Sequence, residues 1–352
     1  MTSMGHLHLN PSKRRPLLKD QETPNEENAT LPVKRLFADP RGSKLNEDAS
    51  VYFIGTATIV IEWQGLRILT DPNFLHTGDH VHLGPGVTAE RKTNPAIDLH
   101  ELPALDCILL SHYHEDHFDQ LVEKSLNRAF NIITTPHAKE CLSSESRDDP
   151  FQSVHALDFF ESIMLHVDRK EPALAGGYGK VPVIKITGLP GKHVPPGPLS
   201  KANSLLKAVP PVNGWLVELG YTFKAPVGGD PDVIDTGYRI YISGDTLFVD
   251  ELKEIPQRLR KDKVDLMLVH LGGTTIPSPA VPLVMVTMDA EQGFKLMQLI
   301  NPDLTIPIHY DDYNVFLSPL SDFKKKVEEE GWRERVVYLD RGEQYEFKVG
   351  GA

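Results

Sequence analysis

Four potential metal ligands fall within six residues in the stretch His112-Tyr113-His114-Glu115-Asp116-His117. This stretch follows an apolar run at 107–110, which is typical of a buried strand, and precedes a helical pattern. Alternation along an extended backbone places His112 and His114 on one side, and Asp116 and His117 come where the chain turns back. Imidazole and carboxylate groups suit zinc, and two clustered metals can share such a run. The alternative, a solvated loop with incidental histidines, is disfavoured by the density of ligands at a strand end.

Strands and helices alternate on both sides of this stretch. Short apolar or alternating runs predict strands at 51–54, 59–63, 66–70, 106–110, 131–135, 163–167, 181–186, 215–221, 238–242, 266–269 and 305–308. Helical periodicity predicts helices at 118–129, 249–261, 289–300 and 320–330. Gln64 and Gly65 predict a two-residue hairpin turn between the second and third strands. The alternation indicates an α/β fold with helices packed on the outside of sheets.

The N-terminal residues differ in composition and periodicity from the rest of the chain. Residues 1–48 are rich in Lys, Arg, Pro, Asn and Glu and show neither a helical nor a strand period, which predicts a mostly disordered N-terminal tail. We expect residues 49–352 to form a single catalytic domain. Two long segments within it, 73–98 and 190–213, lack either period and are expected to be loops beside the functional site.

Composition disfavours several classes of function. Lys and Arg number 37 against 49 Asp and Glu, and the formal charge of −12 repels the phosphate backbone of a nucleic acid. The sequence predicts no membrane span and no secretory signal, so we expect a cytoplasmic protein. The two cysteines are too few for a disulfide framework, and Cys107 is expected to be a buried thiol. No short motif predicts the oligomeric state.

The ligand-rich stretch resembles the HxHxDH motif of the metallo-β-lactamase superfamily, and counterparts of the family's other motifs follow in order. They are Asp71 in TDP at 70–72, His193 in PGKH at 190–193, Asp245 in SGDT at 243–246 and His309 in IPIHY at 306–310. The resemblance covers roughly residues 49–348. It implies a metallo-β-lactamase αββα sandwich, in which two mixed sheets pack face to face with helices outside and metals at one edge.

Taken residue by residue, the resemblance implies two zinc ions per chain. The implied ligands are His112, His114 and His193 for one ion, Asp116, His117 and His309 for the other, and Asp245 as a bridge between both. Iron and manganese accept the same ligands. Two of these residues have ordinary alternatives: His193 as a loop residue, and Asp245 as the N-cap of the helix predicted from 249.

Further residues adjoin these ligands. Asp71 is expected to orient a ligand. His270 is expected to lie at the same edge of the sheet, where it is a candidate for contact with substrate or for an ordinary structural role. Tyr113, Thr246 and Tyr310 neighbour ligands in the sequence and are candidates for hydrogen bonds to substrate, or for packing. The catalytic candidate is Asp116, because a ligand close to the nucleophile can also carry a proton.

The resemblance implies a metal-dependent hydrolase that uses a metal-bridging hydroxide. GTAT at 55–58, together with the motifs around Asp71 and His309, looks like the branch containing UlaG-type lactonases and N-acyl phosphatidylethanolamine phospholipase D. The leading interpretation is opening of a lactone, lactam or cyclic carbamate ring in a small-molecule substrate. A phosphodiesterase resembling that phospholipase is the first alternative. An iron-binding redox member of the fold and a metal-stabilised binding scaffold without catalysis are alternatives from other classes.

Overall fold

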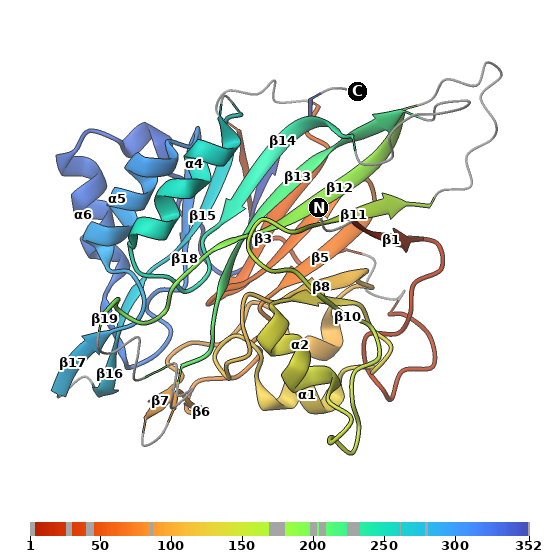
Figure 1. Cartoon of the computed structure of the whole chain (residues 1–352), viewed down its shortest axis with the longest axis horizontal. Helices are drawn as coiled ribbons and strands as arrows, with labels where there is room; N and C mark the ends of the chain where they lie inside the picture. Colours follow the sequence, from red (N-terminus) through yellow and green to blue (C-terminus); the bar gives the residue numbers. More distant parts are fainter. Residues whose placement is uncertain are drawn as a thin grey trace.

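Two β-sheets lie face to face and helices lie on their outer sides (Figure 1). The computed structural model describes residues 4–25, 30–39, 46–84, 87–168, 180–197, 203, 209–223, 233–260, 262–278 and 281–350. This layered arrangement confirms the predicted αββα sandwich.

The first sheet has the strand order β1-β11-β12-β13-β14-β15-β18. Its strands are β1 (Gly5–Leu9), β11 (Ser162–Val167), β12 (Lys180–Pro190), β13 (Asn213–Phe223), β14 (Asp235–Ile242), β15 (Leu266–His270) and β18 (Leu304–Ile308). β11 to β14 are antiparallel neighbours, whereas β14, β15 and β18 run parallel. The carboxyl ends of β12, β14, β15 and β18 therefore meet at one edge.

The second sheet has the strand order β10-β9-β8-β5-β4-β3-β20-β2. Its strands are β10 (Val154–Ala156), β9 (Ile132–Thr134), β8 (Cys107–Leu109), β5 (Leu66–Thr70), β4 (Thr58–Trp63), β3 (Ala49–Gly55), β20 (Glu343–Phe347) and β2 (Arg35–Ala38). β5, β8 and β9 run parallel, so their carboxyl ends also share an edge. Gln64 and Gly65 join β4 to β5 with φ of +53° and +77°, the left-handed conformations of the predicted hairpin turn.

The core lies on both faces of the second sheet, as β3 illustrates. Val51 and Phe53 belong to the cluster between the two sheets, and Tyr52 and Ile54 belong to the cluster under α1 (Gln120–Ser125) and α2 (Pro136–Ser143). All four side chains are at most 1% exposed, which explains why residues 51–54 are apolar in succession instead of alternating. Cys107 is likewise fully buried, as predicted.

The outer side of the first sheet carries the other helices (Figure 1). They are η2 (Asp250–Lys253), α4 (Glu254–Leu259), α5 (Ala290–Ile300) and α6 (Leu320–Glu329), with η1 (Leu99–Glu101) and η3 (Arg333–Arg335) elsewhere in the chain. Their positions confirm three predicted helices. The fourth, predicted at 118–129, is shorter because α1 stops where Leu126 becomes extended and bridges to Leu18.

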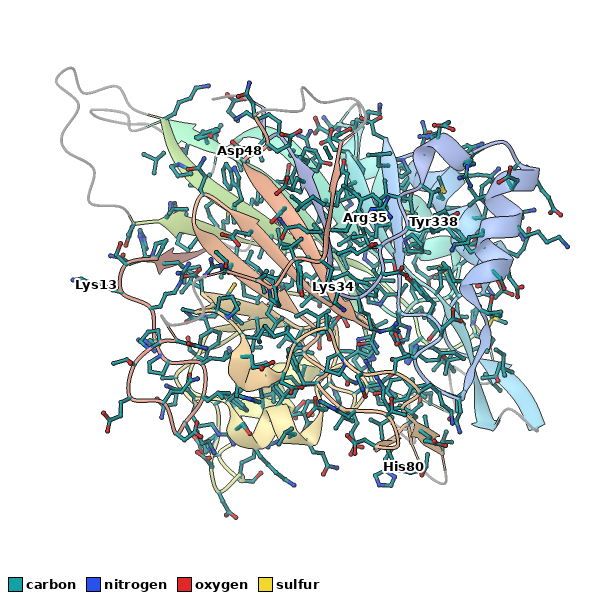
Figure 2. The ribbon with its side chains drawn as sticks, turned by 180° about the vertical axis from the view of Figure 1, so that it is seen from behind. Lys13, Lys34, Arg35, Asp48, His80 and Tyr338 are labelled. Carbon is teal, nitrogen blue, oxygen red and sulfur yellow. The ribbon has the colours of Figure 1, made fainter. Side chains whose placement is uncertain are left out.

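The prediction of a disordered tail is wrong for the described part of residues 1–48. β1 pairs in parallel with β11 and β2 pairs in parallel with β20, and between them Leu17, Leu18 and Leu31 are buried. Figure 2 shows this segment from behind, with Lys13 at the side of the molecule and Lys34 and Arg35 near its middle. The apolar residues are too sparse to make a local period, because their partners lie more than a hundred positions away in the sequence.

The two segments predicted as loops differ in outcome. Residues 73–98 contain the hairpin of β6 (His80–His82) and β7 (Thr88–Glu90) as well as loop. Residues 198–202 and 204–208 of the second segment lie outside the described residues. A small sheet of β17 (Val281–Met285), β16 (Gly272–Ser278) and β19 (Phe316–Ser318) adjoins the edge where the predicted ligands gather.

Candidate metal centre

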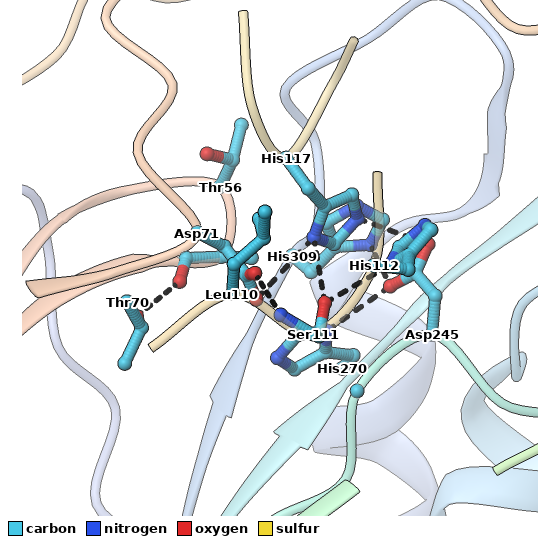
Figure 3. Close-up of polar contacts among 12 residues, drawn as sticks. Thr56, Thr70, Asp71, Leu110, Ser111, His112, His117, Asp245, His270 and His309 are labelled. Atoms are coloured by element: carbon cyan, nitrogen blue, oxygen red, sulfur yellow. Dashed lines mark hydrogen bonds and ion pairs between the residues drawn. The ribbon is translucent and has the colours of Figure 1, made fainter. Parts of the chain in front are cut away.

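The predicted ligands follow the carboxyl ends of strands in both sheets. Figure 3 shows His112, His117, Asp245 and His309 side by side, with Asp71 and His270 next to them. Asp71 directly follows β5 and the stretch 112–117 follows β8, so both come from the second sheet. His193 follows β12, Asp245 follows β14 and His309 directly follows β18, so these three come from the first sheet. Each sheet therefore supplies part of the site.

Three imidazoles form a first group. His112, His114 and His193 place ligand atoms within 4.8 Å of one another. Nδ1 of His112 lies 2.9 Å from Ser111 Oγ, and Nδ1 of His193 donates to the carbonyl oxygen of Val286 at 2.6 Å. These bonds engage Nδ1 of both rings, so that Nε2 is the nitrogen available for a metal.

A second group combines imidazoles with carboxylates. Asp116, His117, Asp245 and His309 place ligand atoms within 4.8 Å of one another. His117 Nε2 lies 3.2 Å from Asp245 Oδ2 and 3.8 Å from Asp116 Oδ2. His309 Nε2 lies 3.7 Å from Asp116 Oδ2, and its Nδ1 donates to the carbonyl oxygen of Leu271 at 3.0 Å.

The two groups adjoin each other. The rings of His112 and His117 have centroids 4.3 Å apart, and His114 Nδ1 lies 2.8 Å from Asp116 Oδ1. The first ligand set consists of three imidazoles. It lies directly beside the second set, which consists of two imidazoles and two carboxylates. That arrangement has room for two neighbouring cations, each with nitrogen or oxygen ligands.

Polar groups around the site hold the ligands in place. Asp71 accepts a hydrogen bond from the Ser111 amide at 2.7 Å, and its other oxygen lies 3.4 Å from His117 Nδ1. His270 Nδ1 lies 3.0 Å from Asp245 Oδ1, and Thr287 Oγ1 donates to Asp245 Oδ2 at 3.1 Å. His270 is fully buried, so its visible role in the structure is to position Asp245.

Buried polar atoms without hydrogen-bond partners converge on this site. Among the described residues they include Nε2 of His112, His114, His270 and His309. Leaving such an atom unpaired costs about 1–3 kcal/mol. Because these atoms are metal-binding nitrogens, the residues fit divalent metal ions.

The electrostatics of the site also match a metal centre. Burial lowers the pKa of His112 well below its usual range and lowers that of His193 to about 4, so both rings are neutral near pH 7. Burial raises the pKa of Asp116 and Asp245, but neighbouring imidazoles outweigh it and hold both well below the usual range. Neutral imidazoles and ionised carboxylates are the forms that bind metals. Burial opposes protonation of His117. The carboxylates of Asp245 and Asp116 outweigh this effect and raise the pKa of His117 well above its usual range, because a positive charge beside two carboxylates is favoured.

Unusual backbone conformations produce the turns at these strand ends. Gly244 has φ of +62°, and a Cβ there would lie 2.4 Å from the carbonyl oxygen of Asn213, so only glycine fits before Asp245. Asp71 and His309 have φ of +34° and +60°, in the left-handed region that non-glycine residues rarely adopt. Strained conformations of this kind cluster at functional sites.

Sequence comparison identifies the family to which this site belongs. The model of the β-lactamase superfamily domain matches residues 66–310. The chain belongs to this superfamily. A metal-dependent hydrolase of Nanoarchaeum equitans is 26% identical over 255 residues, covering 71% of this chain and 92% of the relative. The N-acyl-phosphatidylethanolamine-hydrolyzing phospholipase D 1 of Caenorhabditis elegans is 24% identical over 330 residues, covering 90% and 81%.

Solved structures share the fold. An isothiocyanate hydrolase from Delia radicum gut bacteria superposes with a TM-score of 0.61 at 17% identity, covering 84% of this chain and 98% of that one. The diiron β-hydroxylase CmlA of Streptomyces venezuelae superposes with a TM-score of 0.50 at 14% identity, covering 86% and 54%. The predictions of the superfamily, its fold and a metal-dependent hydrolase are confirmed. In the described part of the chain, no helix is both long and apolar enough to cross a membrane.

Three hydroxyl groups that the sequence offered as candidates for contact with substrate instead donate hydrogen bonds to other groups of the chain. Tyr113 donates to the Glu123 carboxylate at 2.9 Å, Thr246 donates to the carbonyl oxygen of Leu247 at 2.9 Å, and Tyr310 donates to that of Leu339 at 3.0 Å. Each hydroxyl therefore has a structural partner.

Sequence reasoning missed several groups that hold the ligands. Thr287 and the carbonyl oxygens of Val286 and Leu271 come from segments without a recognisable motif. Ser111 could have been identified from the sequence, because it directly precedes His112 after β8.

Proposed function

We propose that this metal-dependent hydrolase holds two zinc ions and opens a lactone, lactam or cyclic carbamate ring in a small molecule. The observation that carries the proposal is the pair of adjoining, largely buried ligand groups. A mixed set of imidazoles and carboxylates suits zinc. When bound, two adjacent metals lower the pKa of a water molecule and polarise a carbonyl oxygen, which is the chemistry that ring opening needs.

The proposed assignment of ligands follows the two groups. His112, His114 and His193 would hold one ion, and Asp116, His117 and His309 would hold the other. Asp245 lies in the second group, and its proposed role as a bridge between both ions rests on the family resemblance. The hydrogen bonds from His193 and His309 to backbone carbonyls support this assignment, since each leaves Nε2 free for a metal.

Asp116 is the proposed carrier of the proton. Its Oδ1 lies 2.8 Å from His114 Nδ1, between the two ligand groups, and Asn73 fixes its backbone by donating to its carbonyl oxygen at 2.8 Å. The neighbouring imidazoles keep its pKa low despite burial, so the side chain is ionised near pH 7. An ionised carboxylate there accepts a proton from water and passes it to the leaving group.

The cations near the site favour a neutral substrate over an anionic one. Two cavities flank the ligands, beyond His193 and beyond His114. Three of the cations that line them are already paired with carboxylates: Lys192 with Glu251, Arg128 with Asp149, and Arg147 with Glu123. Recognition of a phosphodiester relies on such charges. Because these three cations are already paired with carboxylates, their arrangement supports attack on a neutral carbonyl and not on a phosphodiester.

Metal content and activity test the proposal together. The double variant Asp116→Ala/His117→Ala should lose hydrolysis and most of one metal equivalent, measured by elemental analysis and with a panel of lactones and lactams. The matched control is Asp79→Ala/His80→Ala, which removes an exposed Asp-His pair at the start of β6 and should keep both activity and metal content. Full metal content in the first variant would contradict the ligand assignment.

A phosphodiesterase is the second candidate. It is favoured by the C. elegans phospholipase D, because the match covers 90% of this chain. A panel of phosphodiesters, including N-acyl phosphatidylethanolamines, assayed beside the lactone panel with and without chelator, separates the two. Chelator-sensitive cleavage of phosphodiesters alone would replace ring opening as the proposed reaction.

An iron-dependent redox protein is the candidate from another class. The similarity in fold to a diiron β-hydroxylase motivates it, and imidazole and carboxylate ligands accept iron as well as zinc. Visible absorbance of the purified protein, together with iron in elemental analysis, would favour this candidate over zinc.

We further propose one catalytic domain in the cytoplasm. The shared core supports a single domain, since Leu9 of β1 packs in the same cluster as residues of both sheets. The chain has only two cysteines, and Cys107 is a buried thiol, which fits a reducing compartment.

A further inference from the structure

We propose that the substrate carries an apolar group, which binds in a cavity beside His193. The inference rests on the proposed function, because it takes the ligand groups as the place where the bond is broken. It adds which part of the substrate the protein recognises and on which side of the metals that part lies.

The cavity beside His193 has a volume of about 400 Å³. Its apolar lining comes from the segment after β10, the segment after β12 and the segment that leads into β13. The residues concerned are Phe159, Val194, Val209, Pro210, Pro211 and Val212. Cavities of this size with mostly apolar walls are typical of small-molecule sites.

Three polar side chains in the cavity wall are engaged elsewhere. The Asn203 side chain exchanges two hydrogen bonds of 2.8 Å with the backbone of Val209, and Lys192 Nζ pairs with Glu251 at 2.5 Å. His193 uses Nδ1 for the carbonyl oxygen of Val286. Because these groups already have partners, an apolar occupant leaves none of them unsatisfied.

One wall of the cavity belongs to the candidate metal centre itself. The His193 ring has its centroid 5.3 Å from that of His112 and 6.0 Å from that of His114. Phe159, in the wall of the same cavity, is 41% exposed, so part of the apolar lining is open to solvent. The cavity therefore connects a solvent-exposed apolar side chain with the ligand His193.

The opposite side of the centre has a different character. The cavity beyond His114 has a volume of about 340 Å³ and is lined by charged residues, including Glu115, Glu123, Lys124 and Arg147. Placing an apolar group there would desolvate these charges. The structure thus assigns the apolar part of the substrate to the His193 side and a polar part to the His114 side.

Size narrows the class of substrate. A closed apolar cavity of about 150 Å³ accommodates benzene. A cavity of about 400 Å³ therefore accommodates a medium-length alkyl chain or a substituted aryl ring. The inferred substrate is a lactone, lactam or cyclic carbamate with such a substituent.

Calorimetry on the metal-loaded protein with primary alcohols from butanol to decanol tests the cavity without a reaction. Affinity should rise about fourfold with each methylene group until the cavity is full. Phe159→Ser and Val209→Asp, which alter an exposed and a partly exposed wall residue, should flatten this dependence. Leu36→Asp is the matched control, because Leu36 is 56% exposed on β2 outside both cavities, and it should behave as the unmodified protein.

The same variants are then assayed with γ-lactones of increasing side-chain length. A rise in kcat/KM with chain length that Val209→Asp removes supports the proposal. Alcohol affinity independent of chain length would overturn it. If alcohols bind with the expected dependence but no lactone is hydrolysed, the cavity stands and the proposed reaction fails, so the two failures are distinguishable.

Discussion

Asp245 is held at both oxygens of its carboxylate by groups that are not themselves in the proposed ligand set. His270 lies 3.0 Å from Oδ1 and Thr287 donates to Oδ2 at 3.1 Å. His270 is fixed in turn, because its backbone amide donates to Ser243 Oγ at 2.9 Å. The proposed role of Asp245 as a metal ligand would depend on this fixed orientation of its carboxylate.

Replacing His270 therefore tests whether Asp245 is positioned by its neighbours. His270→Ala should weaken metal binding about 10- to 100-fold while the fold is retained. Competition with a chromophoric chelator measures the affinity, and circular dichroism checks the fold. His270→Asn should rescue much of the loss, because its amide can replace Nδ1–H, and the exposed His100→Ala is the control. Unchanged affinity in His270→Ala would show that Thr287 alone suffices.

Tyr113 gives a prediction of the opposite kind at this scale. It lies between two proposed ligands in the sequence, but its hydroxyl donates to Glu123 at 2.9 Å. Tyr113→Phe should leave metal content and kcat/KM unchanged and reduce the free energy of unfolding by about 1 kcal/mol, the contribution of one hydrogen bond. Denaturant titration and elemental analysis measure the two effects. A fall in metal content would assign Tyr113 to the site after all.

Among the elements, the N-terminal segment is fixed to the second sheet in part by a largely buried ion pair. Arg14 donates from Nε and Nη2 to the two oxygens of Asp106, at 3.0 and 2.9 Å, and the Asp106 side chain is only 2% exposed. The backbone amide of Arg67, in β5, donates to the same carboxylate at 2.7 Å. Asp106 directly precedes β8, so this pair ties the segment between β1 and β2 to the second sheet.

Arg14→Ala should destabilise the protein by about 3 kcal/mol at neutral pH, because it leaves the buried carboxylate without its cation. Burial raises the pKa of Asp106, and Arg14 opposes that rise. A pKa raised in the folded state means that protonation favours folding, and that this stability is lost as the pH rises through the folded pKa. Without Arg14 the pKa rises further, so the destabilisation should shrink as the pH falls.

Urea unfolding at several pH values measures this dependence. The control is Lys19→Ala, which removes an exposed pair with Asp149 and should change stability by less than about 1 kcal/mol at any pH. If Arg14→Ala lowers the free energy of unfolding by the same amount at neutral and at acidic pH, the role of Asp106 is contradicted.

The same elements show what local sequence reveals and what it does not. β3, β4 and β5 are predictable because their apolar runs and the Gln64-Gly65 turn are contiguous. β1 and β2 are not, since each is stabilised by a parallel partner remote in the sequence. The site divides likewise. The stretch 112–117 is local, whereas Thr287 reaches Asp245 only through the fold.

At the scale of the whole molecule, the proposed metals connect the two sheets. The first group joins His112 and His114, after β8 in the second sheet, to His193, after β12 in the first. The second group joins Asp116 and His117 to Asp245 and His309 in the same way. Among the described residues, this edge of the sandwich holds several buried ring nitrogens without hydrogen-bond partners, and metal ions would engage them.

Metal removal should therefore weaken the entire sandwich and not only the site. An ion at a thousand times its dissociation constant stabilises a folded protein by about 4 kcal/mol if the unfolded chain does not bind it. Differential scanning calorimetry should show a large fall in Tm with chelator and its recovery with added zinc. In Asp116→Ala/His117→Ala, added zinc should recover only the part of the Tm that comes from the ion at the first group. An equal Tm with and without chelator would mean that the sheets hold this edge together unaided, and that the buried imidazoles find their partners in water or in each other.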